Sequence, residues 1–423
     1  MKIKRYPNIQ ETVTSTELEN GLTINIIAKP GYNKSFAMFA TNYGGADRRF
    51  RLDGDWIDTP AGVAHFLEHK MFDTPDGGNA LTALSSRGAS PNAFTSSSMT
   101  AYYFECTTDF YENLRTLLSF VSVPYFTDES IQKEQGIIGQ EIRMIEDSPG
   151  HAIYYNLLRC LYSKNPVRES VAGSIESIAE ISAQTLYDCH KVFYAPSNMV
   201  LTIAGDVDPG QVIAIAQEIL PAERQIAPES DYGTEESLLP NQTCVSTQME
   251  VSAPQFLLGA RVLPEPKGLP LLRQQLVAEI ALQCMLGSAS PFYLKLYDEG
   301  LLSTDFGAEF NYSSGSAVML AGGESRDPDA VAEAMREEFV RFAKEGPAPT
   351  LFERMKKVSF GDHLRMLGYF RTLCSEMSAN YFLGFSPLDA FELLETITVE
   401  DVRSFVAEHL TPDRFAMSVI LPK

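Results

Sequence analysis

The sequence predicts a chain built from two duplicated α/β halves, on the grounds of its length, an internal repeat and a linker near its middle. Its 423 residues exceed one ordinary hydrophobic core and indicate two or more domains. Residues 181–203 align without gaps to residues 397–419, which lie 216 positions further on. Residues 221–242 are proline-rich, polar and acidic, as expected of a linker. We therefore predict halves at residues 1–220 and 243–423.

Each copy of the repeat has the same succession of elements. A Ser- or Thr-capped helix is followed by a proline, Pro196 or Pro412, and then by an apolar strand. The first half opens with predicted strands at residues 22–27 and 36–40. The second half opens similarly, with strands predicted at 250–252 and 256–260.

Composition excludes several classes of protein. An apolar content of 44% and an aromatic content of 10% indicate a globular protein rather than a disordered one. The net charge of −21 argues against nucleic-acid binding, which needs a basic surface. We expect no signal peptide, no membrane anchor and no membrane span. The six cysteines have no paired spacing, so we expect reduced thiols and a cytoplasmic location.

The segment Gly62-Val-Ala-His-Phe-Leu-Glu-His69 carries the strongest chemical signal. On the predicted helix, His65 and His69 are four residues apart and share a face, so both imidazoles can reach one metal ion. Glu68 lies beside them and can accept a proton from a metal-activated water. This is the H-x-x-E-H order of the inverzincin metallopeptidases. The alternative is a pair of helix-surface histidines next to a solvated glutamate.

A catalytic zinc site needs a third protein ligand, and the region 128–147 offers one. Its isoleucines recur with helical period, and Thr127 or Asp128 can cap its start. Glu134 and Glu141 are one heptad apart and therefore lie on one stripe of that helix. Either glutamate alone would be taken for a solvated carboxylate.

At these residues the chain resembles the pitrilysin, insulinase and mitochondrial processing peptidase family, in particular its bacterial paired-subunit members. The family's third zinc ligand is a glutamate some seventy residues beyond the motif; Glu141, 72 residues after His69, matches it. Glu134 matches a glutamate that orients a metal ligand. The resemblance implies one Zn²⁺ per chain, held by His65, His69 and Glu141, with Glu68 as the general base.

The resemblance also implies a fold. It covers almost the whole chain and belongs to the α+β class: two homologous α/β halves, each a mixed, mostly antiparallel sheet with flanking helices, which form a clamshell around a chamber. Residues 1–220 are then the metallopeptidase half. Residues 276–287 stand where the second half would carry its own metal helix, and they contain no histidine.

Residues 88–105 begin with a turn and end in a β-rich run. If this strand lies at a sheet edge, it can pair with an extended peptide through backbone hydrogen bonds. In the family an Asn-Ala-Phe/Tyr-Thr segment does so, which implies substrate-binding roles for Asn92 and Ala93. An ordinary hairpin with Asn92 in the turn is the alternative.

The second half departs from the family at one place. Self-sufficient members carry an arginine and a tyrosine in a segment resembling R-E-K-x-G-L-A-Y, which grips the substrate and stabilises the oxyanion. Alignment on Gly300 puts Leu296 and Ser303 at those two positions. We therefore expect a related subunit, in a heterodimer, to supply the missing pair; a homodimer is the other option.

The resulting expectation is a zinc-dependent metalloendopeptidase that cleaves peptides or short unfolded segments and is completed by a partner subunit. Two rivals stay open. One is a non-catalytic assembly or core subunit of the same fold. The other is a zinc hydrolase that acts on a small molecule.

Overall fold

A computed structural model describes residues 1–75, 77–233, 236–313 and 315–423, and it divides into two compact units. The first unit contains most of the N-terminal half and the second most of the C-terminal half. Neither unit is one continuous stretch of sequence: the first comprises 1–142, 170–232 and 364–382, and the second 143–169, 233–363 and 383–423. A short segment of each half therefore belongs to the unit formed mostly by the other half: 143–169 to the second unit and 364–382 to the first.

The sheet of the first unit has, among the described residues, the strand order β1-β2-β3-β9-β4-β8-β7. Strands β3 and β9 are parallel to each other, and all other neighbouring strands of this sheet are antiparallel. The predicted strands at 22–27 and 36–40 are present as β3 and β4. The strand bounds are β1 Lys2–Tyr6, β2 Glu11–Glu17, β3 Thr23–Ala28, β4 Ser35–Thr41, β7 Ser90–Thr95, β8 Thr100–Cys106 and β9 Met199–Gly205, with a separate hairpin of β5 Arg49–Leu52 and β6 Asp55–Asp58.

The sheet of the second unit repeats this topology. Its order is β10-β14-β11-β13-β12, which matches β3-β9-β4-β8-β7 strand for strand, including the one parallel pair. The bounds are β10 Cys244–Met249, β11 Gln255–Val262, β12 Gly307–Ser313, β13 Ser316–Glu324 and β14 Phe415–Pro422. The prediction of a strand at 250–252 was wrong, because the chain turns there, with Val251 N donating to Met249 O, and the strand ends at Met249. The strand predicted at 256–260 lies within β11.

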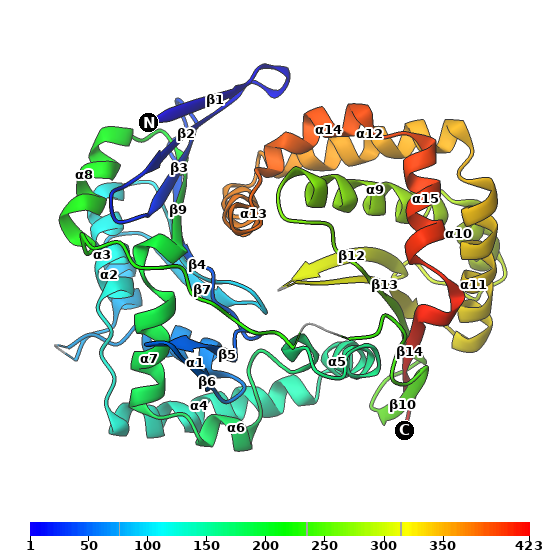
Figure 1. The fold of residues 1–423 in the computed structure, drawn as a ribbon, viewed down its shortest axis with the longest axis horizontal. Coiled ribbons are helices and arrows are strands. Elements are labelled where there is room, and N and C mark those ends of the chain that lie inside the picture. Colours follow the sequence, from blue (N-terminus) through cyan, green and yellow to red (C-terminus); the bar gives the residue numbers. More distant parts are fainter. Residues whose placement is uncertain (76, 234–235, 314) are drawn as a thin grey trace. The chain divides into compact units, whose positions relative to one another are not determined.

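The first sheet carries helices on both faces (Figure 1). Neighbouring residues of β8 show this, since side chains alternate along a strand: the ring of Tyr102 packs on Phe120 of α3, whereas that of Tyr103 lies under Arg371 of α13. The helices from the N-terminal half are α1 Val63–Lys70, α2 Ala80–Ser86, α3 Phe110–Ser122, α4 Asp128–Glu146, α6 Ile175–Ala179, α7 Ala183–Phe193 and α8 Pro209–Ile219. Helix α13, Phe370–Phe382, comes from the C-terminal half and belongs to the first unit.

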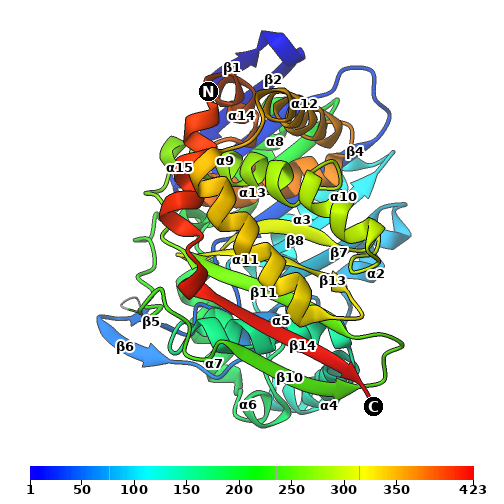
Figure 2. The ribbon, with the colours of Figure 1, turned by 90° about the vertical axis from the view of Figure 1, so that its right-hand side faces the viewer.

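The second sheet also has helices on both faces. One face packs into a large apolar core with α9, α11 and α15, and the other packs on α5, Pro149–Leu161, which comes from the N-terminal half. In Figure 2 α11 runs across the strands of this sheet, and α15 packs on α11. The remaining bounds are α9 Leu269–Met285, α10 Pro291–Asp298, α11 Pro328–Glu345, α12 Pro349–Met366, α14 Ala390–Thr396 and α15 Val399–His409.

The predicted internal repeat is present in both units. In one copy α7 is capped by Ser182 and leads through a 3₁₀ turn at Pro196 into β9; in the other α15 is capped by Thr398 and leads through Pro412 into β14. Each cap satisfies a backbone N–H that the first turn of a helix leaves unpaired. The duplication seen in the sequence is thus a duplication of structure.

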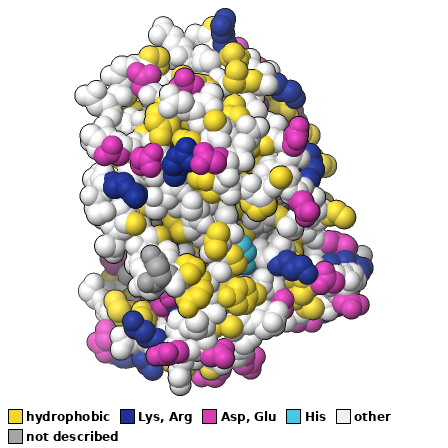
Figure 3. All heavy atoms as spheres, turned by 90° about the vertical axis from the view of Figure 1, so that its left-hand side faces the viewer, with side chains coloured by type: hydrophobic (Ala, Val, Ile, Leu, Met, Phe, Trp, Pro, Cys, Tyr) yellow, Lys and Arg dark blue, Asp and Glu magenta, His cyan; other side chains and the backbone are white. Residues whose placement is uncertain are grey.

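Acidic and basic side chains are mixed on the surface of the first unit. Figure 3 shows acidic and basic side chains separated by uncharged and hydrophobic ones on the face it presents. Arg115 pairs with Glu218 at 2.8 Å, and Lys191 pairs with Asp53 at 2.9 Å. All six cysteines are free, and five are buried. Within the described ranges, no helix is both long and apolar enough to cross a membrane.

The described residues of 221–242 form neither a helix nor a strand; residues 234 and 235 lie outside the described part. The division into halves at 1–220 and 243–423 stays a prediction, as does the chamber between them.

Candidate metal centre

The helix that carries the motif is short and tightly held at its start. Helix α1 begins directly after Gly62, whose φ of 93° is in the region that favours glycine. A Cβ at Gly62 would lie 2.6 Å from the carbonyl oxygen of Ala172, so a neighbouring loop packs directly on the helix start. Phe66 and Leu67 are fully buried beneath it. This packing fixes where His65 and His69 are presented.

His65, His69 and Glu141 converge as the sequence predicted. One ligand atom from each lies within 4.8 Å of the others, and this is the cluster of three such groups found in the described part of the chain. Glu141 Oε1 is 3.6 Å from His65 Nε2, and Glu141 Oε2 is 3.6 Å from His69 Nε2. Helix α4 starts at Asp128 with Thr127 as its cap and brings Glu141 to the site, as predicted.

These residues fit a zinc ion. Tetrahedral zinc with bonds of about 2.0–2.2 Å places its ligand atoms roughly 3.3–3.6 Å apart, which matches the separations from Glu141. Two imidazoles and one carboxylate also form a donor set typical of catalytic zinc, with a fourth position left for water. Neither 3.6 Å contact is short enough for a strong hydrogen bond, which leaves the lone pairs of these atoms available to a metal.

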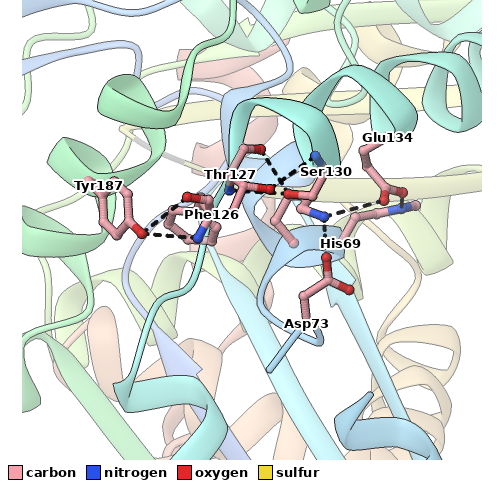
Figure 4. Close-up of polar contacts among 8 residues, drawn as sticks. His69, Asp73, Phe126, Thr127, Ser130, Glu134 and Tyr187 are labelled. Atoms are coloured by element: carbon pink, nitrogen blue, oxygen red, sulfur yellow. Dashed lines mark hydrogen bonds and ion pairs between the residues drawn. The ribbon is translucent and has the colours of Figure 1, made fainter. Parts of the chain in front are cut away.

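Glu134 holds His69 from the side away from Glu141. His69 Nδ1 lies 3.1 Å from Glu134 Oε1 (Figure 4). The other ring nitrogen, Nε2, is the one that lies 3.6 Å from Glu141 Oε2. Lys70 is only 2% exposed; its ammonium pairs with Asp73 and lies 3.9 Å from Glu134 Oε2. The predicted orienting position of Glu134 is thus reinforced by a buried cation that we did not predict.

The two histidines have different electrostatic environments. Burial, with a smaller contribution from the adjacent imidazole, lowers the pKa of His65 to about 4. Burial also opposes charge on His69, but the hydrogen bond with Glu134 and the surrounding carboxylates outweigh it, so the pKa of His69 is raised. A neutral His65 is the form that can bind a metal.

Glu68 is positioned by a hydroxyl group. Its carboxylate accepts a hydrogen bond of 2.6 Å from Thr95 Oγ1 at the end of β7, and the residue is 8% exposed. Burial raises the pKa of Glu68, although the Thr95 hydrogen bond and His69 act against that shift. A carboxylate with a raised pKa is better suited to accept and return a proton near neutral pH.

The strand predicted to bind peptide is an edge strand. β7 pairs only with β8, so its other side is free among the described strands. Asn92 and Ala93 lie in β7, and their side chains point to opposite faces of the sheet. Ala93 N donates to Asn92 Oδ1 at 2.8 Å, so this backbone donor is held by a side chain that an incoming strand could replace.

Comparisons with known proteins agree with this site. Residues 54–174 match the family model described as insulinase (peptidase family M16), and residues 180–359 match the model described as peptidase M16 inactive domain. A Bacillus subtilis protein described as an uncharacterized zinc protease is 35% identical over 99% of this chain and 98% of its own length. The chain belongs to peptidase family M16.

Solved structures of M16 proteins share the fold. A crystal structure described as an M16-like peptidase from Alicyclobacillus acidocaldarius has a TM-score of 0.93 and 34% identity, and the match covers 99% of this chain and 100% of that one. Pitrilysin matches with a TM-score of 0.79 and 16% identity over the whole of this chain but only 46% of its own. This M16 chain therefore corresponds in fold to about half of pitrilysin.

The second half of this M16 chain contains no counterpart of the metal site in its described residues. Leu296 lies in α10 and is 3% exposed within the apolar core of the second unit. Ser303 follows that helix, and its carbonyl accepts a hydrogen bond from Tyr293. Neither residue has the guanidinium or phenol that the aligned positions carry in self-sufficient M16 members.

Sequence reasoning missed two residues next to the site. Thr95 is the last residue of the Asn-Ala-Phe-Thr segment, and that match was the signal that could have indicated it. Lys70 directly follows His69, and a lysine at a helix end gives no sign that it will be buried. Both depend on contacts between elements that are distant in the sequence.

Proposed function

We propose that this chain is a zinc-dependent endopeptidase that cleaves peptides or short unfolded segments. The observation that carries the proposal is the convergence of His65, His69 and Glu141 next to Glu68 and beside the free edge of β7. A bound zinc ion would polarise the scissile carbonyl and acidify water. The names of its relatives, which are described as zinc proteases, support the same class.

The protein groups have separate roles in this proposal. Glu68, oriented by Thr95, takes a proton from the attacking water and returns it to the leaving amine. Asn92 and Ala93 align the peptide along β7 by backbone pairing, which gives affinity with little dependence on sequence. Glu134 keeps the Nε2 atom of His69 in place.

We further propose that a related subunit completes the site. With Leu296 and Ser303 at the two aligned positions, this chain has no oxyanion-stabilising arginine and tyrosine there. The match covers only 46% of pitrilysin, which is therefore about twice as long as this chain. A partner that carries arginine and tyrosine in the R-E-K-x-G-L-A-Y segment would supply that pair. A homodimer of this chain would not, because both copies lack it.

The test combines zinc stoichiometry with cleavage of a quenched fluorescent peptide library. Wild type and Glu68→Gln are each measured alone and with the related protein encoded beside this chain. We expect one zinc per chain in both, and cleavage only with Glu68 present, because the substitution keeps the ligands and removes the base. Zinc binding without any turnover would instead favour a non-catalytic assembly subunit. Turnover of small molecules but not of peptides would favour a zinc hydrolase that acts on small molecules. Full activity without the partner would refute the proposal that a second subunit completes the site.

A further inference from the structure

Two polar groups next to β8 have no hydrogen-bond partner among the described residues: the Tyr103 hydroxyl and the Arg371 guanidinium, which lies over the Tyr103 ring. The hydroxyl of Tyr103 is buried and makes no hydrogen bond with any described residue, and Tyr103 as a whole is 5% exposed. The guanidinium of Arg371, an exposed residue in the first turn of α13, lies 5.1 Å from the centroid of the Tyr103 ring. Among the described residues, the side chain of Arg371 has no hydrogen bond or ion pair. A buried hydroxyl is ordinarily paired, so this one needs an explanation.

The pair lies where a bound peptide would place side chains. Tyr103 stands directly opposite Asn92 in the β7–β8 ladder. Its ring lies between that of Phe36 of β4, at 5.3 Å, and that of Phe94 of β7, at 6.3 Å. A strand added to the free edge of β7 alternates its side chains between faces, so every second residue projects onto the face where Tyr103 and Arg371 lie.

Nearby carboxylates of the protein do not neutralise Arg371. Glu105 shares the face of Tyr103, but its carboxylate pairs with Lys34 at 2.9 Å. Glu68 accepts a hydrogen bond from Thr95, whose side chain points to the opposite face of β7 from that of Asn92. Besides burial, however, the charge of Glu68 still acts to raise the pKa of Tyr103. The Arg371 guanidinium therefore has no carboxylate partner among the described residues.

We infer that Arg371 and Tyr103 form a subsite that recognises a carboxylate on a peptide bound along β7. The inference rests on the proposed function. Arg371 supplies several N–H donors for charge-assisted hydrogen bonds to a carboxylate, and the Tyr103 hydroxyl can donate a further one. The carboxylate is either an Asp or Glu side chain or the C-terminus of a short substrate.

The subsite gives the enzyme a preference that backbone pairing alone cannot give. Charge-assisted hydrogen bonds to a partly desolvated group typically change binding by about tenfold to hundredfold. We expect a peptide with glutamate at the matching position to bind about tenfold to hundredfold more tightly than its glutamine analogue. The lysine analogue should bind more weakly than either.

The test uses the zinc-loaded full chain with its partner subunit. A series of otherwise neutral peptides carries glutamate, glutamine or lysine at successive positions, with free or amidated C-termini. Affinity is measured by fluorescence anisotropy on the Glu68→Gln protein, and kcat/KM is measured on wild type. Arg371→Glu should reverse the preference from glutamate to lysine, and Tyr103→Phe should reduce it while keeping the ring. Loss of the preference on amidation would identify the C-terminal carboxylate as the ligand.

Arg115→Glu is the matched control, because it makes the same charge change on α3, where Arg115 pairs with Glu218. It should leave the preference unchanged. The inference is overturned if Arg371→Glu alters the glutamate-to-lysine ratio no more than Arg115→Glu does. Absence of cleavage of every peptide would instead count against the peptidase proposal, and the anisotropy series would still decide whether the carboxylate preference exists.

Discussion

The two halves of this chain share the order of five strands, but they differ in the helix that packs on the helix of the repeat. In the first half α1 presents His65, Glu68 and His69 and packs on α7. In the second half α9 packs on α15, and its buried face is formed by apolar residues such as Leu276 and Ile280. The same topology therefore supports a helix whose buried face is mostly apolar, with one buried glutamine, Gln274, or a helix with a buried carboxylate, Glu68. The cluster of His65, His69 and Glu141 is an addition that the fold tolerates and does not require.

The largest expected effect follows from removing a ligand. Glu141→Ala should weaken zinc binding by well over a hundredfold, since loss of an orienting residue alone costs about 10–100-fold. Zinc content and hydrogen exchange measure this: in wild type, zinc should slow exchange in α1 and α4 and leave α9 unchanged. Glu279→Ala, on α9, is the control and should retain zinc. Slowed exchange in α9 would break the proposed division between the halves.

A second difference between the halves predicts how stability depends on pH. His190 in α7 aligns with Val406 in the other repeat, and both are buried. Burial lowers the pKa of His190 to about 4, and its Nε2 lies 3.0 Å from the carbonyl oxygen of Val121.

The unfolded chain takes up this proton near pH 6.5, whereas the folded one resists it until about pH 4. Stability that is present above pH 6.5 is therefore lost as the pH falls, by about 3 kcal/mol for this group. His190→Gln should remove that part of the loss, as measured by urea unfolding at pH 7 and pH 4. Parallel pH profiles for wild type and variant would contradict the assignment.

A glycine-to-alanine substitution should destabilise the start of α1 more than a comparable turn in the second half. Gly62→Ala combines an unfavourable φ with a contact of 2.6 Å to the Ala172 carbonyl, so we expect a loss of roughly 2–3 kcal/mol in the free energy of unfolding. Gly300→Ala has a similar positive φ with open space around it and should cost about 1 kcal/mol. Equal losses would mean that the contact relaxes freely.

The smallest effect is expected from Glu134. Glu134→Gln keeps an acceptor near His69 but removes the charge, so zinc affinity should fall by about 10-fold or somewhat more, within the 10–100-fold range of such residues. Competition with a chelator measures the affinity. An unchanged affinity would show that Lys70 and local packing suffice to hold His69.

Local patterns were predictable from the sequence where their cause is local. The spacing of His65, Glu68 and His69 and the stripe of Glu134 and Glu141 follow from helical periodicity, and the repeat follows from caps and prolines. The strand predicted at 250–252 was displaced to end at Met249, because a short apolar run does not indicate its register with a neighbour. Thr95 and Lys70 were missed because their roles depend on neighbours brought close by folding.

The sequence by itself determined the duplicated order of elements and the residue types of the metal cluster, since both are encoded in short-range spacing. Only the tertiary structure decided that α5 and α13 each pack on the sheet of the other half. That exchange places Arg371, far along the chain, over Tyr103. An amphipathic helix buries its apolar face on any sheet of suitable shape, so its partner is chosen by long-range packing, which no local pattern records.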